Sequence, residues 1–188
     1  KSTAEVASTF MEDFVLEELM KNANDQTRLE ILMEKLNSDV SSIFRQTAFY
    51  NFESELHKNF REKGYLSKEE IGSLFKKHMH SYMGEAVDTL QAGNWWIYVP
   101  HFRDSFYVYS YASGLLISKA LQSSYKQNPS FIKKVKEFLA AGTSDSPKNI
   151  FKALDIDITD KKFWTDGLQE LEKTLKQAQQ LAKKLKKV

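Results

Sequence analysis

Hydrophobic residues recur along most of the chain at intervals of three and four, the spacing of one face of an α-helix. In the first segment Val6, Phe10 and Phe14 begin such a stripe, and the polar run 22–25 ends it. Only three prolines and seven glycines interrupt the periodic runs. The pattern predicts an all-α protein built as a multi-helix bundle.

The second apolar stripe covers residues 26–62, either as one long helix or as two helices with a bend near residues 37–38. Gly64 is expected to end this segment. Ser67, with Glu70 three residues later, forms a capping box, which predicts that the next helix begins there.

Later helices have recognisable starts. Ser146 followed by Pro147 is a favoured pair at a helix N-terminus, and Thr159 is expected to cap the last helix. Residues 176–188 are rich in Lys and Gln and are expected to form a frayed basic tail. Since no repeat or domain boundary is visible, residues 1–188 are predicted to form a single helical domain.

The centre of the chain, residues 95–114, carries two Trp, four Tyr and one His, all aromatic rings with a polar tip. Such rings suit a wall that is partly core and partly wet pocket. Pro100 interrupts the helical pattern, and Asp104 or Ser105 is expected to cap the helix that follows.

Helical spacing predicts how the polar rings of this stretch are distributed. Tyr107 and Tyr111 are four residues apart and share a helix face, whereas Tyr109 points elsewhere. His101 lies in the preceding turn and can face the same space. The sequence therefore predicts a cluster of hydrogen-bond donors.

Composition excludes several classes of function. Lys and Arg number 27 against 25 Asp and Glu, so no electrostatic argument favours nucleic acid as a partner. The absence of cysteine excludes disulfides and thiolate metal sites, and a cytoplasmic location is expected. No apolar run reaches membrane-spanning length and no signal peptide is visible, so no membrane partner is expected.

The residues by themselves do not predict a metal site. His78 and His80 lie on opposite sides of a helix, and neither His-x-x-x-His nor His-Glu-x-x-His occurs in the chain. His57 lies among charged residues and is typical of a helix surface. Glu5 and Glu12 are seven residues apart near one helix face, where the helix dipole alone favours them.

Four separated stretches together resemble the C-terminal catalytic region of the oligoendopeptidase F family, thimet-oligopeptidase-like zinc metallopeptidases that cleave short peptides. Their order and spacing also match, so the resemblance covers nearly the whole chain. The stretches are AEVASTFME at 4–12, FRQTAFYNFE at 44–53, PHF with FYVYSYASG at 100–114, and FLAAGTSDSP through FW at 138–164.

The resemblance implies a metal site. Family members bind one catalytic zinc through two histidines of a His-Glu-x-x-His helix and a glutamate of the next helix. Glu5 matches that glutamate ligand. Glu12 matches a second acidic residue, which is expected to orient a ligand histidine.

The resemblance also implies a role for the donor cluster. His101, Tyr107 and Tyr111 match the family's histidine and tyrosines that bind substrate and stabilise the transition state, with Tyr109 a near competitor of Tyr111. Tyrosine has an unperturbed pKa of about 10, so at neutral pH it can donate to the peptide carbonyl oxygen. Glu5 and this cluster are expected to face a shared gap.

One departure from the family changes the expectation. Without His-Glu-x-x-His the chain lacks both histidine ligands and the general base, and catalytic zinc sites use three protein ligands. The chain is therefore predicted to be one lobe of a zincin-like cleft, inactive without the missing N-terminal half and open on the face where that half packs. The alternative is a non-catalytic helical module that binds a peptide or protein through residues 95–111.

Overall fold

The computed structural model describes residue 3, residues 5–104 and residues 106–187. Helices make up 80% of the structure, and the described residues contain no strand, which confirms the all-α prediction. The chain divides into two compact units, a division that the sequence does not reveal. Unit 1 comprises residues 40–112, and unit 2 comprises the described parts of 2–39 and 113–188.

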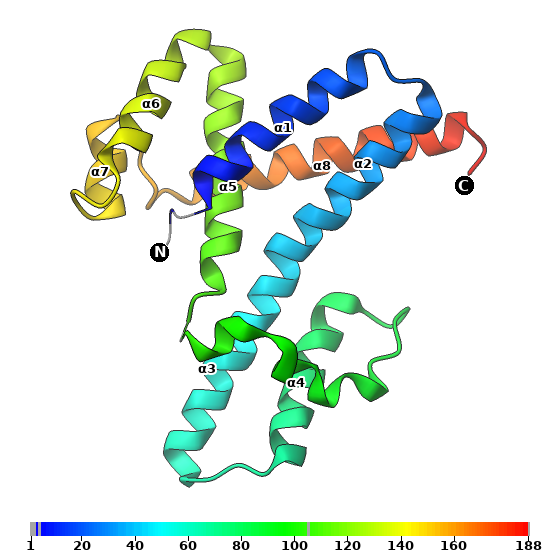
Figure 1. Ribbon diagram of the computed structural model, residues 1–188, viewed down its shortest axis with the longest axis vertical. Helices are drawn as coiled ribbons and strands as arrows, with labels where there is room; N and C mark the ends of the chain where they lie inside the picture. The colour runs from blue at the N-terminus through cyan, green and yellow to red at the C-terminus, as the bar shows by residue number, and fades with distance from the viewer. Residues whose placement is uncertain (1–2, 4, 105, 188) are drawn as a thin grey trace. The chain divides into compact units, whose positions relative to one another are not determined.

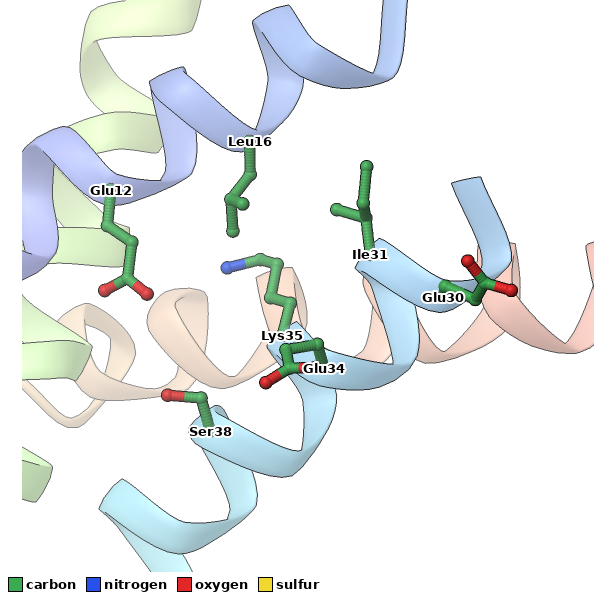
Figure 2. Close-up of a pocket in the computed structure, with 7 residues that line it drawn as sticks. All are labelled: Glu12, Leu16, Glu30, Ile31, Glu34, Lys35 and Ser38. Atoms are coloured by element: carbon green, nitrogen blue, oxygen red, sulfur yellow. The ribbon is translucent and has the colours of Figure 1, made fainter. Parts of the chain in front are cut away.

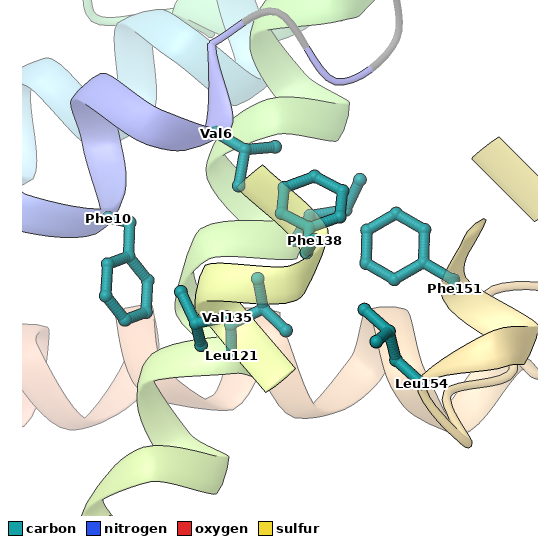
Figure 3. Close-up of a cluster of buried hydrophobic side chains, with 8 residues drawn as sticks. Val6, Phe10, Leu121, Val135, Phe138, Phe151 and Leu154 are labelled. Carbon is teal, nitrogen blue, oxygen red and sulfur yellow. The ribbon is translucent and has the colours of Figure 1, made fainter. Parts of the chain in front are cut away.

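Unit 2 is built around the first helix of the chain. Val6 and Phe10 of α1 point into a cluster of buried side chains from α5, α6 and α7, among them Leu121, Val135 and Phe138 (Figure 3). The helices of this unit are α1 (Val6–Lys21), α2 (Asp25–Val40) as far as Asp39, α5 (Tyr109–Gln127) from Ser113 onward, η4 (Pro129–Phe131), α6 (Ile132–Ala141), α7 (Pro147–Ala153) and α8 (Lys161–Lys184).

The last helix differs from its predicted form at both ends. Asp160, not Thr159, caps α8, because the Asp160 side chain accepts a hydrogen bond from the Lys162 backbone. At its other end α8 continues to Lys184, through residues expected to be frayed. The reason is apolar contact: Ala178 is buried against Leu29 and Leu32 of α2, and Leu181 packs on the same cluster.

Unit 1 contains a helical hairpin. Helices α3 and α4 run antiparallel (Figure 1), and Gly64 ends α3 in the left-handed conformation, with φ 76°. The predicted capping box of Ser67 and Glu70 begins α4. The elements of this unit are η1 (Ser41–Arg45), α3 (Gln46–Lys63), α4 (Lys68–Met83), η2 (Leu90–Tyr98), η3 (Pro100–Arg103) and the first turn of α5.

No break separates α2 from α3. Of the two alternatives, the bend near residues 37–38 is absent, and a π-helical turn, η1, follows α2 directly. In unit 1 the core is dominated by aromatic rings from the hairpin, and Phe102 and the fully buried Val108 pack against them. This packing fixes both ends of the segment between η3 and α5.

Helix length and polarity determine whether a helix can span a membrane. Among the described residues, none of the helices combines the length and the apolar character needed to cross a lipid bilayer.

Candidate functional site

The segment that carries the predicted donors is less helical than expected. Asp104 does not cap a following helix; it ends η3, where its backbone N–H donates to the carbonyl of His101 at 3.1 Å. Ser105, the other predicted cap, lies outside the described residues. Helix α5 begins only at Tyr109, so Tyr107 precedes it.

His101, Tyr107 and Tyr111 nevertheless lie together within unit 1. The Tyr111 hydroxyl is 2.9 Å from Nε2 of His101. The Tyr107 ring stacks on the imidazole, with centroids 5.4 Å apart and planes at 16°. Tyr107 and Tyr111 meet edge to face at 5.7 Å, and all three side chains are half-buried.

Tyr109 has different neighbours. Its ring packs against Tyr50 of α3 at 6.4 Å, and it is exposed. The geometry therefore groups Tyr111, and not Tyr109, with His101 and Tyr107.

In the hydrogen bond between Tyr111 and His101, either side chain can be the donor. If Nε2 carries no proton, the phenol donates to it; if Nε2 carries the proton, the imidazole donates to the phenol oxygen. In the second state the Tyr111 hydroxyl oxygen acts as the acceptor.

Glu5 lies in unit 2, directly before the first residue of α1. Its carbonyl accepts hydrogen bonds from Thr9 Oγ1 at 2.7 Å and Ser8 Oγ at 3.1 Å, and its side chain is half-buried. Because Glu5 belongs to unit 2 and the donor cluster to unit 1, their expected convergence stays a prediction.

A seam of small and polar residues on α5 holds the start of α1. A methyl group added at Gly114 would lie 2.8 Å from Cβ of Glu5, so only glycine fits there. One and two turns later, Ser118 Oγ donates to the Val6 carbonyl at 2.9 Å and Gln122 Nε2 donates to the Phe10 carbonyl at 2.8 Å. The position of Glu5 is thus set by close packing on α5.

Glu12 is exposed on α1 and lines a pocket of about 350 Å³ between α1 and α2. Figure 2 shows its carboxylate directed into this space, which Lys35 and Ser38 of α2 also enter. Its predicted role in orienting a ligand histidine stays a prediction.

Next to Glu12 is a buried charge cluster that sequence reasoning missed. Asp13 and Asp39 pair with Lys35 and Lys119, and the Lys119 side chain is only 1% exposed. Lys119 Nζ lies 3.0 Å from Asp39 Oδ2 and 3.4 Å from Asp13 Oδ2. Burial alone would lower the pKa of Lys35, but the Asp39 and Asp13 carboxylates raise it above its ordinary value. The cluster ties α1 to α2 and α5.

The sequence did contain a signal for this cluster. Asp13 falls in the register of the apolar stripe begun by Val6 and Phe10, and Lys119 interrupts the apolar run from Leu115 to Leu121. A charged residue at a buried position requires a charged partner.

The described residues of this chain do not themselves form a zinc site. None of their histidine, aspartate and glutamate side chains gather in groups of three that would hold a metal ion. His78 contacts Glu55 at 2.7 Å, and His80 contacts Glu85 at 3.1 Å. A hydrogen bond from Lys77, assisted by His78, lowers the pKa of Glu55 although burial opposes this.

Two known proteins match most of this chain. It is 32% identical over 187 residues to oligopeptidase PepF of Bacillus subtilis, which covers 94% of this chain and 28% of that protein. It is 28% identical over 188 residues to the chromosomal oligoendopeptidase F of Lactococcus lactis subsp. cremoris, with 96% and 31% covered.

A solved structure is also similar. Oligoendopeptidase-F from Enterococcus faecium matches with a TM-score of 0.85 and 28% identity, over 97% of this chain and 36% of that one. The chain therefore spans between 28% and 36% of the length of these relatives. The family model described as Peptidase family M3 matches residues 2–170. With this match over most of its length, the chain belongs to peptidase family M3.

Proposed function

We propose that this chain is part of a metallopeptidase that hydrolyses short peptides, and that His101, Tyr107 and Tyr111 bind the substrate. The observation that carries the proposal is the 2.9 Å contact of the Tyr111 hydroxyl with His101, on whose imidazole the Tyr107 ring is stacked. The similarity to oligopeptidases and oligoendopeptidases supports the substrate class.

The donors have a definite chemical task. When water attacks a peptide carbonyl, negative charge grows on the carbonyl oxygen. A phenol keeps its proton at neutral pH and can donate to that oxygen without being ionised. Since the rings of Tyr107 and Tyr111 are packed against His101, their hydroxyls require little reorganisation to do so.

We further propose that the metal is a single zinc ion and that Glu5 is one of its ligands, with Glu12 orienting another. The relatives are about three times as long as this chain, which leaves room for the remaining ligands and the general base in residues outside it. Zinc polarises the carbonyl and lowers the pKa of bound water in such sites. The chain alone is then inactive, and a cytoplasmic location fits its lack of cysteine.

An uncovered stripe on α1 supports the view that further residues pack on unit 2. Met11, Val15 and Leu19 recur one helical turn apart and are 58%, 56% and 57% exposed. Exposed apolar side chains in a row are typical of a surface that another element covers.

A peptidase assay tests the proposal. The full-length protein that carries this chain should cleave a quenched-fluorescent peptide, lose the activity to a chelator and regain it with zinc. The 188-residue chain alone should give no turnover under the same conditions. A full-length protein without chelator-sensitive cleavage would overturn the proposal.

One surface favours a second candidate, a non-catalytic module that binds a peptide or a protein. Trp95, Ile97 and Tyr98 of η2 are 42%, 46% and 85% exposed. Such a module would bind its ligand equally well with and without the chelator, and Glu5→Gln would change neither metal content nor binding.

A further inference from the structure

Phe106 is a strained residue in the backbone between His101 and Tyr107. Phe106, directly before Tyr107, has φ 56°, in the left-handed region that bulky side chains rarely adopt. A residue is kept in such a conformation only when its surroundings determine it, and such residues concentrate at functional sites. The residues around Phe106 therefore show what holds it in this conformation.

Helix α3 supplies these surroundings from one of its faces. Glu53 Oε1 accepts a hydrogen bond from the Phe106 backbone N–H at 2.7 Å. The Phe106 ring packs against Tyr50 at 6.2 Å and against His57 at 5.1 Å. Tyr50, Glu53 and His57 are three and four residues apart and so share a face of the helix. His57 is thus half-buried, and not the surface residue that the sequence suggests.

Burying the Glu53 side chain on this face of α3 costs stability. It is 1% exposed, and among the described residues its second oxygen, Oε2, has no hydrogen-bond partner. A buried carboxylate with an unsatisfied oxygen destabilises a fold, since apolar packing is available as an alternative. What Glu53 contributes at this position is the hydrogen bond that its Oε1 accepts from the Phe106 N–H.

We propose that Glu53 is a positioning residue for the donor cluster. By holding the Phe106 N–H, it fixes the left-handed turn that brings Tyr107 back onto the ring of His101 and starts α5 in the register that places Tyr111 beside the same ring. Its effect on catalysis rests on the function proposed above. Its effect on the geometry of the cluster does not.

Three variants separate positioning from general stability. Glu53→Leu keeps the size of the side chain but removes the acceptor, whereas Glu53→Gln keeps an oxygen that can accept from Phe106. Glu55→Leu is the matched control: it lies on the same helix and removes a partly exposed carboxylate that pairs with Lys77 and His78 of α4.

In the full-length protein, Glu53→Leu should lower kcat by about 100-fold, the scale of a misplaced catalytic group, and leave zinc content unchanged. Glu53→Gln should retain most of the activity, and Glu55→Leu should behave as the wild type. If Glu53→Leu keeps wild-type kcat, or if Glu53→Gln loses as much as Glu53→Leu, the proposal is overturned.

A second measurement, on the 188-residue chain, needs no activity. By NMR the Phe106 amide should be protected from hydrogen exchange, and nuclear Overhauser contacts should join the rings of His101 and Tyr107. Both should disappear in Glu53→Leu and persist in Glu53→Gln. A wild-type Phe106 amide that exchanges like an unstructured peptide would refute the proposal even if Glu53→Leu fails to fold. If the wild-type enzyme shows no chelator-sensitive cleavage, the proposed function fails, and the NMR result still decides the role of Glu53.

Discussion

The phenol oxygen of Tyr111 lies 2.9 Å from Nε2 of His101, and the Tyr107 ring stacks on the same imidazole. The three residues belong to one compact unit, whose aromatic core fixes η3 and the start of α5. The cluster is therefore organised by packing within that unit.

The first prediction concerns the hydroxyl of Tyr111. In the full-length protein Tyr111→Phe should lower kcat by about 10²–10³-fold, because it removes a proposed donor to the developing oxyanion. Steady-state kinetics with a quenched-fluorescent peptide measure the effect. Tyr109→Phe is the control, since Tyr109 packs on Tyr50 and not on His101, and its kcat should stay close to wild type. A larger loss in Tyr109→Phe than in Tyr111→Phe would reverse the assignment.

The buried charge cluster gives a prediction about stability. Lys119→Met leaves the carboxylates of Asp13 and Asp39 with a single cation, Lys35. Breaking a buried pair in this way should lower the free energy of unfolding by about 3–5 kcal/mol. Urea denaturation of the chain, followed by circular dichroism, measures the change.

A surface pair provides the matched control for Lys119. Lys126 lies on the same helix and pairs with Glu17, with both side chains more than two-fifths exposed, at 42% and 43%. Lys126→Met should therefore cost less than about 1 kcal/mol. Equal losses in the two variants would show that the buried cluster contributes nothing specific.

The seam between α1 and α5 gives a third prediction. Gly114→Ala places a methyl group 2.8 Å from Cβ of Glu5, so the start of α1 must shift. The variant should be destabilised by about 1–3 kcal/mol, and the full-length protein should lose zinc, as measured by atomic absorption. Gly167→Ala makes an equally close contact, 2.8 Å from the Leu116 carbonyl, and should be destabilised with normal zinc content. Normal zinc in Gly114→Ala would argue against Glu5 as a ligand.

The stability that the capping box at the start of α4 contributes should depend on pH. Hydrogen bonds from Lys63 and from the backbone and side chain of Ser67 lower the pKa of Glu70 from 4.5 to about 2. The unfolded chain binds this proton near pH 4.5 and the folded chain only near pH 2, so the unfolded state carries more protons between these values. The contribution of Glu70 is thus complete above pH 4.5 and lost as the pH falls through about 2.

Denaturation of the wild type and of Glu70→Gln across this range tests the sign. The stability advantage of the wild type should be largest at neutral pH and should shrink as the pH falls below 4.5. A difference that stays constant down to pH 2 would contradict the assignment.

Features set by neighbours in sequence were predictable. The capping box of Ser67 and Glu70 and the helix start at Ser146 depend on side chains within one turn, and both occur as predicted. The cap of α8 was misplaced by one residue because Thr159 and Asp160 are both competent caps.

Features set by distant residues were not predictable in the same way. Helix α5 starts later than the caps Asp104 and Ser105 suggest, because Phe106 takes a left-handed conformation with its N–H bonded to Glu53 of α3. The end of α8 is helical because its apolar residues contact α2. The contact of Glu53 with Phe106 leaves no trace in the local pattern, whereas Ala178, Leu181 and Leu185 recur at helical spacing and were a signal for the end of α8. The grouping of His101, Tyr107 and Tyr111 was expected from helical spacing and from the family resemblance. Because Tyr107 precedes α5, helical spacing is not what brings it to Tyr111.

The most direct test of the central claim compares Glu5→Gln with Tyr107→Phe in the full-length protein, with zinc content and peptide cleavage measured on the same samples. Glu5→Gln should lose both zinc and activity, because it removes a proposed ligand. Tyr107→Phe should keep its zinc and lose about 10²–10³-fold in kcat, because it removes only a donor to the substrate. Full zinc and full activity in Glu5→Gln, or unchanged kcat in Tyr107→Phe, would contradict the account.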